Sequence, residues 1–396
     1  MIILGLNAFH ADAAACVIRV TNADGSFGEF SAVATTNSSL NLSAQPTAGT
    51  DLNTLFGQRR NLVRPRFWSM LRDLLRFYKH APAVLDDPAT TDMSLGAYLD
   101  HHRYGRAFVA DHLLPMGAAI WSTTAEDMRA YPVRAFVRFF VSHGLLNITD
   151  RPQWRTVRGG SRVYVEALTA DYADRIVHDG IAEIRRQADG VILTTTLGEQ
   201  QHFDDVVIAA HADEALTMLT DADDMEQRLL GPWRYTANTA YLHTDSRLMP
   251  KNKRVWASWN FLEGDRADQL CVTYWMNRLQ PLETDRDVFV TLNPVHEPDP
   301  AAVLQTIDYS HPYFDVAALE TQPDLWQLQG RRNTWFCGAY FGFGFHEDGL
   351  QSGLAVAEQL GGVRRPWNVE GESNRIHLPD AAAPVEQSNP IPVAAE

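Results

Sequence analysis

A glycine-rich loop near the carboxyl end, followed at once by a predicted helix, is the segment best suited to chemistry. In WFCGAYFGFGFHEDGLQSGLAVAEQL, glycines occupy positions 338, 342, 344 and 349, and the helix is predicted over 350–360. Because glycine has no Cβ, the backbone of this loop can approach a ligand closely. The free N–H groups of a helix N-terminus favour an anionic or electron-rich ligand, and Asp348 is suited to capping the helix. The segment predicts a ligand-binding loop, although a tight strand-to-helix turn without a ligand has the same pattern.

His346 and Glu347 adjoin this loop and are the acid–base candidates of the chain. Either side chain could equally serve to fix the loop. The rest of the sequence has no Ser–His–Asp grouping, no P-loop and no cluster of metal ligands, so we expect no metal site. Cys16, Cys271 and Cys337 are far apart and form no CxxC pair, which indicates a reducing environment rather than a disulfide framework.

The elements that must position this loop change in character along the chain. The first half is predicted to be mainly helical, with apolar residues at helical spacing in RRNLVRPRFWSMLRDLLRFYKHAP and Pro82 after it. From residue 151, a helix in GGSRVYVEALTADYA precedes two strands, GIAEIRRQ and GVILTTTLG, and then FDDVVIAAHADEALTML predicts a buried strand that leads into a helix. Strand-like runs over 233–293 predict a mixed or antiparallel sheet. Residues 2–20 predict a strand, a turn and a second strand.

Length and charge limit the function classes. At 396 residues the chain should form two domains. The formal net charge of −15 disfavours nucleic acid as a partner. Neither a signal peptide nor an apolar run long enough to span a bilayer is present, so we expect a soluble cytoplasmic protein.

Several segments together resemble bacterial amine-oxidase-like flavoproteins, a group predicted to bind NAD or FAD. The resemblance covers about residues 51–367, in the order of that family, and its most specific motifs are GTDLNTLFGQRRNLVRPRFW, LLPMGAAIWSTT, FVRFFVSHGLLNITDRPQWRTVRGGSRVYV and TWFCGAYFGFGFHEDGLQSGLAVAE. It implies an α/β fold in which an incomplete FAD-binding Rossmann-like domain (151–215 and 331–366) joins a mixed α+β substrate domain (51–150 and 216–330). Residues 1–50 are then an atypical N-terminal segment, and 367–396 a disordered tail.

The same resemblance implies FAD as cofactor and assigns residues to it. Flavin contacts would lie in the carboxyl-terminal loop and helix, at Gly338, Asp348, Gly349 and Leu350. The backbone near Ile181 would face the adenine, and the small residues Ala209 and Ala210 would lie beside the dinucleotide. Without the resemblance, these last three positions would be ordinary sheet core.

The family begins with a strand, a GxGxxG turn and a helix, and no GxGxxG occurs in this chain. Because that turn holds the diphosphate, we expect weakened FAD binding. The opening ILGLNAFHADAAACVI instead resembles that of carbamoyltransferases related to nodulation enzymes, in which Asn7, His10 and Asp12 would lie near a phosphate and metal site. A hairpin without that function is the alternative.

The leading function is therefore FAD-dependent oxidation, with hydride passing from a substrate carbon to the flavin. Aromatic residues such as Trp154, Trp256, Trp259, Tyr274 and Trp275 suggest an apolar pocket for a lipid or acyl chain rather than a polar amine. The alternatives are a non-catalytic protein that has lost FAD and, more distantly, a carbamoyltransferase-related protein.

A basic segment over 59–79 could contact an anionic membrane surface. An internal helix with a solvated basic face is the alternative. Its cations are Arg59, Arg60, Arg64, Arg66, Arg72, Arg76 and Lys79.

Overall fold

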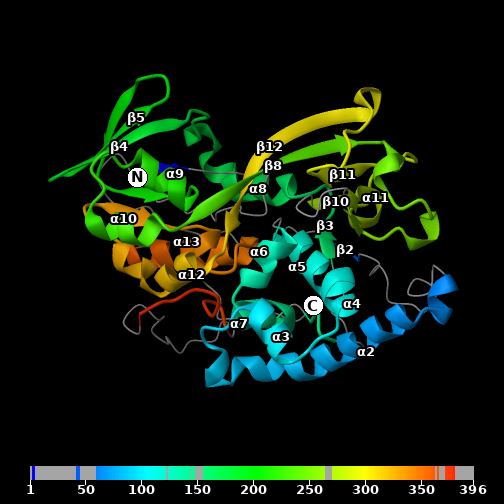
Figure 1. The fold of residues 1–396 in the computed structure, drawn as a ribbon. Helices are drawn as coiled ribbons and strands as arrows, with labels where there is room; N and C mark the ends of the chain where they lie inside the picture. Colours follow the sequence, from blue (N-terminus) through cyan, green and yellow to red (C-terminus); the bar gives the residue numbers. More distant parts are fainter. Residues whose placement is uncertain are drawn as a thin grey trace, which may run out of the picture.

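The computed structural model describes residues 2–4, 42–44, 59–121, 124–142, 144–147, 155–263, 270–361, 364 and 371–379. The ribbon shows an antiparallel sheet over a layer of helices, beside a smaller group of strands and helices (Figure 1). Asn7, His10, Asp12 and Cys16 lie outside the described residues, as does Trp154. The boundaries expected for the two domains stay a prediction.

A small parallel sheet organises the part that carries the carboxyl-terminal loop. Its order is β1 (Ile2–Leu4), β7 (Val206–Ile208) and β13 (Thr334–Phe336), with both neighbours parallel to β7. All three residues of β7 are buried, as expected of a central strand with both faces covered. Helices α9 (Ala212–Met218) and α13 (His346–Gln359) follow β7 and β13 respectively, which confirms the predicted strand–helix order.

An antiparallel meander lies beside this sheet. It consists of β4 (Ile181–Gln187), β5 (Gly190–Thr195) and β6 (Gln200–Phe203), and helix α10 (Asp224–Leu230) packs close to α9. The two predicted strands β4 and β5 are confirmed. β6 was not predicted, because its first three residues, Gln200, Gln201 and His202, are polar and exposed and give no apolar signal.

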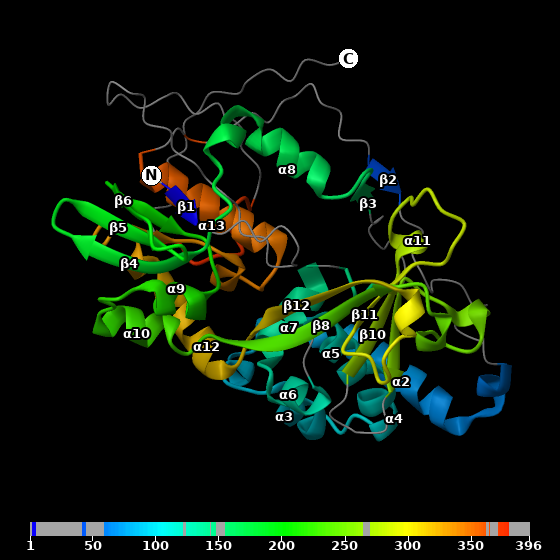
Figure 2. The ribbon, with the colours of Figure 1, turned by 90° about the horizontal axis from the view of Figure 1, so that it is seen from above.

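The large sheet has five antiparallel strands in the order β12–β8–β11–β10–β9 (Figure 2). Their bounds are β8 Arg234–His243, β9 Trp259–Glu263, β10 Leu270–Trp275, β11 Phe289–Leu292 and β12 Val303–Tyr313. The antiparallel sheet predicted over 233–293 is confirmed. β12 has no counterpart among the predicted strands, because its residues are mostly exposed or half-buried and lack an apolar alternation.

The first half is helical, as predicted. Its elements are η1 Arg59–Val63, α2 Pro65–His80, α3 Leu95–His101, α4 Arg106–Phe108, the π-turn η4 Val109–Leu113, α5 Leu114–Trp121, α6 Ala125–Ala130 and α7 Val133–Ser142. Fully buried Phe77, Phe108, Phe136 and Phe140 hold α2, α4 and α7 together. Among the described helices, none is both long and apolar enough to cross a bilayer.

The remaining elements are short. They are β2 Leu42–Ala44, paired with β3 Arg155–Val157, and helices α8 Arg162–Thr169, α11 Met276–Leu279 and α12 Val316–Thr321.

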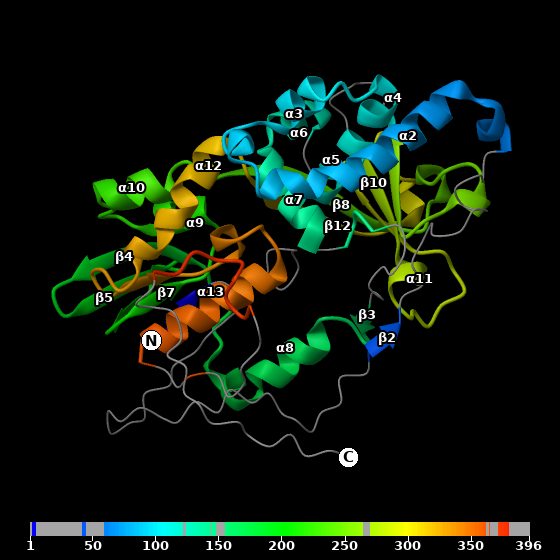
Figure 3. The same cartoon turned by 90° about the horizontal axis from the view of Figure 1, so that it is seen from below.

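The prediction of a disordered tail from residue 367 is wrong for residues 371–379. This segment runs beside α13 (Figure 3) and buries Ile376, which is 7% exposed, in the main core. The composition concealed it because its contacts come from scattered residues, among them Glu372, Arg375, Ile376 and Leu378, without any periodic pattern.

One buried arginine ties the meander to the helices. Arg186 on β4 donates to Asp221 Oδ1 (2.8 Å) and to Glu226 Oε2 (2.9 Å), and the side chains of Arg186 and Glu226 are 1% and 2% exposed. Glu226 also accepts from the backbone N–H of Asp223 as part of a capping box on α10. Removing one partner of such a pair leaves an uncompensated buried charge.

We predict that Arg186→Ala lowers the free energy of unfolding by about 3–5 kcal/mol. Arg185→Ala is a matched control on the same strand, because Arg185 is exposed, and it should change stability by only ~0.5 kcal/mol. Urea unfolding of both variants measures the difference. Equal stability of the two would contradict the assigned role.

Candidate functional site

The candidate site lies at the carboxyl ends of β7 and β13. The backbone N–H of Cys337 donates to the carbonyl of Ile208 (3.1 Å), which brings the residues after both strands together. A Cβ on Gly338 would lie 3.7 Å from the carbonyl oxygen of Ala210, and Ala209 is buried beside it. Ligands of parallel sheets bind at this edge, where the strands end.

A single hydroxyl, that of Ser352, connects helix α13 to this edge of the sheet. Ser352 is fully buried, and its Oγ accepts from the Gly338 N–H (3.1 Å) and donates toward the carbonyl of Gly349 (3.0 Å). The loop between β13 and α13 is therefore fixed at both ends. The predicted positions Ala209, Ala210, Gly338 and Gly349 converge here.

Asp348 organises the loop from inside. Its carboxylate is fully buried and accepts from the N–H of Phe345 (2.8 Å). A Cβ on Gly342 would lie 2.4 Å from Asp348 Oδ1, so only glycine permits this approach. Burial raises the pKa of the Asp348 carboxyl, while hydrogen bonds and charge from Arg375 oppose that shift.

Arg375, from the segment 371–379, is the counter-ion of this carboxylate. Its Nε donates to Asp348 Oδ1 (2.6 Å) and its Nη2 to Oδ2 (3.2 Å), while its backbone N–H donates to Gln351 Oε1 (3.1 Å). The guanidinium also lies 5.1 Å from the centre of the Phe343 ring. The sequence does not indicate Arg375 as a site residue, because its segment has no periodic pattern and is predicted to be a tail.

The other predicted residues lie further out. His346 and Glu347 are exposed on the first turn of α13, where Glu347 accepts from Gln351 Nε2 (2.9 Å). Leu350 is 43% exposed on the same helix, and Ile181 begins β4 in the meander. The exposure of His346 and Glu347 favours the alternative of fixing the loop. Their catalytic role and the cofactor role of all these residues stay predictions.

Two buried polar atoms at the edge have no partner among the described residues. They are the hydroxyl of Tyr340, which is 2% exposed, and Nε2 of His211. His211 directly follows Ala210 and stacks on Tyr235 at 4.1 Å. Burial raises the pKa of Tyr340 well above its ordinary value, so its hydroxyl stays protonated. A buried group left unpaired costs about 1–3 kcal/mol, which a bound polar ligand would offset.

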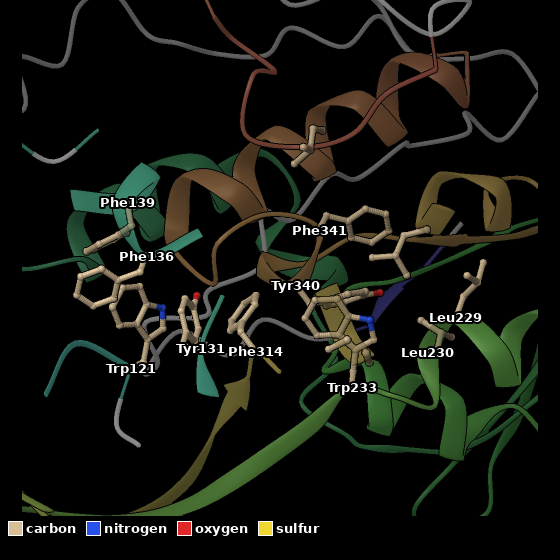
Figure 4. Close-up of a cluster of buried hydrophobic side chains, with 14 of the residues drawn as sticks. Trp121, Tyr131, Phe136, Phe139, Leu229, Leu230, Trp233, Phe314, Tyr340 and Phe341 are labelled. Carbon is tan, nitrogen blue, oxygen red and sulfur yellow. The ribbon is translucent and has the colours of Figure 1, made fainter. Parts of the chain in front are cut away.

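An aromatic hollow adjoins the loop. Figure 4 shows the rings of Trp121, Tyr131, Phe314 and Tyr340 in a row beneath the brown ribbon of the loop and α13. Trp121, Tyr131 and Phe314 border a small hollow of about 20 Å³ that is partly open to solvent, together with Asp127, Ala130, Pro312, Tyr313 and Asp315.

Two contacts join the hollow to the loop. Phe139 of α7, which packs against Trp121 of the hollow (4.8 Å), stacks on Phe345 just before α13 (4.9 Å). Burial and the nearby Asp348 charge both raise the pKa of Tyr131.

The tryptophans singled out from the sequence lie elsewhere. Trp256 and Trp275 pack against Phe289 as a separate small core, and Trp259 packs against Tyr274 at 5.5 Å. The residues of the hollow had no signal in the sequence because they come from α5, α6 and β12, which only the fold brings together.

We predict that Arg375→Ala lowers the free energy of unfolding by about 3–5 kcal/mol at neutral pH, because it leaves Asp348 buried without a counter-ion. The folded-state pKa of Asp348 is already raised, and this variant raises it further. Stability linked to such a group is present at low pH and lost as pH rises through the folded pKa. The variant should therefore regain stability as pH is lowered from neutral toward the ordinary pKa of a carboxyl, about 4.

Urea midpoints across this pH range provide the measurement. The double variant Arg375→Ala/Asp348→Asn is the control, because it has no carboxyl to titrate and should lose the added pH dependence. A single variant as stable as the unmodified chain at every pH would show that the pair does not hold the loop.

Comparison with known proteins places this architecture. The family described as flavin containing amine oxidoreductase matches residues 37–361, and no curated protein matches the chain. A triple mutant of putrescine oxidase has a similar fold (TM-score 0.56, 11% identity, 91% of this chain and 92% of that chain). Putrescine oxidase bound to putrescine (0.53, 9%, 74% and 76%) is also similar. So is cyclohexylamine oxidase from Brevibacterium oxydans IH-35A (0.51, 13%, 81% and 83%).

The structural matches are too distant in sequence to show more than the fold, which is the amine-oxidase-like α/β fold expected from the sequence. The family match begins at residue 37, before the boundary expected at 51, and extends over most of the chain. The flavin cofactor follows from this family. The chain belongs to the flavin-containing amine oxidoreductases.

Proposed function

We propose that the chain holds the flavin ring at the carboxyl ends of β7 and β13 and oxidises an apolar, acyl-type substrate in the aromatic hollow. The observation that carries this proposal is that the hollow adjoins the loop before α13. A Cβ on Gly344 would lie 2.8 Å from Phe314, and Tyr340 of the same loop lies beside Phe314 (Figure 4). Among the described residues, the Tyr340 hydroxyl and His211 Nε2 have no hydrogen-bond partner. The flavin ring has polar atoms along one edge and is otherwise apolar, so it suits apolar surroundings that contain a few polar groups.

The residues at the edge fit this cofactor. Ala209, Ala210 and Gly338 would let the ring approach the backbone, and Gly349 would do so from the side of α13. Tyr340 and His211 could each donate or accept one hydrogen bond at the polar edge. A bound flavin supplies a two-electron acceptor for hydride, so the protein has to position the substrate and exclude water.

The hollow supports an apolar substrate rather than an amine. Its two carboxylates are already engaged: Asp127 accepts from Tyr313 Oη (3.0 Å), and Asp315 pairs with Arg234 and accepts from the Ala318 N–H (2.8 Å). A cationic amine would have to displace these partners. The remaining lining is largely aromatic, which favours a hydrocarbon chain.

We predict that riboflavin and FAD bind with affinities within about tenfold of each other, because the proposed contacts are all to the ring and lack phosphate contacts worth ~1.5–3 kcal/mol each. Quenching of flavin fluorescence on titration measures both. FAD binding tighter by a factor of a thousand would show a diphosphate site elsewhere in the chain.

Gly349→Val should lower the binding affinity for both riboflavin and FAD more than about tenfold, because a branched side chain fills the space at the start of α13. Circular dichroism should show the helices retained. Ala182→Val is the control, because Ala182 is exposed on strand β4, where a branched side chain is tolerated. Unchanged flavin affinity in Gly349→Val would count against the assigned edge.

The substrate class has its own test. With FAD supplied in excess and oxygen removed, long-chain acyl compounds should bleach the flavin absorbance, and primary amines should not. Phe314→Asp, which places a charge in the hollow, should slow bleaching by acyl compounds while leaving riboflavin binding unchanged. Bleaching by amines alone would overturn the apolar assignment but leave the flavin edge intact.

A further inference from the structure

The outward face of α2 carries an alternating row of basic and apolar side chains. Arg64 at the N-cap is followed by Trp68, Arg72, Leu75 and Lys79, spaced three or four residues apart, and all five are exposed. We call these five residues the basic–apolar stripe. The spacing places them on one face of the helix.

The opposite face of α2 is committed to the protein. Phe77 is fully buried, and Asp73 is 1% exposed and accepts from the Gly105 N–H (2.8 Å). Two of the basic residues in this segment are also used internally. Arg66 forms a two-pronged ion pair with Asp111 (2.7 Å), and Arg76 lies 4.0 Å from the centre of the Tyr104 ring. Within the stripe, Arg72 Nε lies 3.5 Å from Asp73 Oδ1, although 74% of its side chain stays exposed. The stripe is therefore the solvent-facing side of α2.

Apolar exposure continues beyond the helix. In η1, which precedes α2, Val63 is 82% exposed and Leu62 is 46% exposed. Trp68 is 47% exposed and donates its indole N–H to the carbonyl of Leu62 (2.9 Å), which holds the two elements together. Figures 1 and 3 show α2 along the outer edge of the molecule, with η1 extending beyond the helical layer.

We propose that this stripe, with Leu62 and Val63, docks the protein on an anionic lipid surface. Residues 59–79 contain seven basic side chains and one acidic side chain, Asp73, in a chain of net charge −15. This local excess of positive charge complements anionic headgroups within a Debye length of ~8–10 Å, beyond which the acidic remainder is screened. Tryptophan and leucine between the cations suit insertion at the headgroup boundary, where arginine and lysine reach back to phosphate.

The alternation favours a membrane over a soluble polyanion. A nucleic acid or acidic protein would use the cations but would leave Val63, Leu62 and Leu75 in water. On a membrane, these exposed apolar side chains would be buried in lipid, and their burial would add to the free energy of binding. Association should therefore depend on both lipid charge and the apolar side chains.

Sedimentation with vesicles tests this proposal on the full chain. The protein should sediment with phosphatidylglycerol-containing vesicles at low salt, and much less with pure phosphatidylcholine. About 1 M salt, where the Debye length is ~3 Å, should largely release it. Absence of sedimentation with the anionic vesicles, or equal sedimentation with both lipids, would overturn the proposal.

Variants separate the charged from the apolar part. Reversing Arg64, Arg72 and Lys79 to glutamate should lower partitioning by about 100-fold or more. Trp68→Ala should lower it by roughly tenfold without altering its salt dependence. The matched control reverses the exposed Arg175, Arg185 and Arg228, which lie in or beside the meander and α10, across the molecule from α2 (Figure 2).

The control has the same net charge as the triple stripe variant, so it should sediment like the unmodified chain. An equal loss in both would show that net charge alone governs binding and would contradict the stripe. Unchanged partitioning of the triple stripe variant would contradict it as well. Heparin provides a last comparison. If heparin binds the unmodified chain, and Trp68→Ala binds vesicles as well as the unmodified chain does, then the stripe is a polyanion site and the membrane assignment fails.

Discussion

The buried carboxylate of Asp348 is the constraint on which the candidate site depends. It holds the N–H of Phe345, requires glycine at 342 and binds Arg375, so three separate parts of the chain meet at one group. A buried charge is tolerated only when it is paired and hydrogen-bonded. Here Arg375 provides the opposite charge, and the Phe345 N–H provides a hydrogen bond. The loop is therefore ordered by electrostatics from within, and not by packing alone.

This ordering connects the two regions that the proposed chemistry needs. On one side, Ser352 joins α13 to the end of β13, where the Tyr340 hydroxyl and His211 Nε2 have no hydrogen-bond partner among the described residues. On the other side, Phe345 stacks on Phe139, and Tyr131 lies near the same carboxylate. A change in the loop would consequently affect the cofactor edge and the aromatic hollow together. In the proposed function the substrate would lie close to the flavin, and this shared support would hold the two regions in place relative to each other.

Much of the fold could be predicted from local patterns. The apolar run of β7, the alternation in β8 and β10, and the glycines after β13 are local signals, and all became the expected elements. β12 could not be predicted, because its pairing with β8 gives it order that its own polar sequence does not indicate. The site was predicted only in part. The glycine positions follow from close backbone approach and the alanine positions from the family resemblance. The pairing of Arg375 with Asp348, and the burial of the Tyr340 hydroxyl and of His211 Nε2, arise only in the fold.

A crystal structure of the chain soaked with riboflavin would test the central claim most directly. The account predicts ring density against Ala210, Gly338 and Gly349, with the Tyr340 hydroxyl within hydrogen-bonding distance of the ring and the Asp348–Arg375 pair unchanged. The binding of the ring at another place, or a loop that must release Arg375 before the ring can enter, would contradict it.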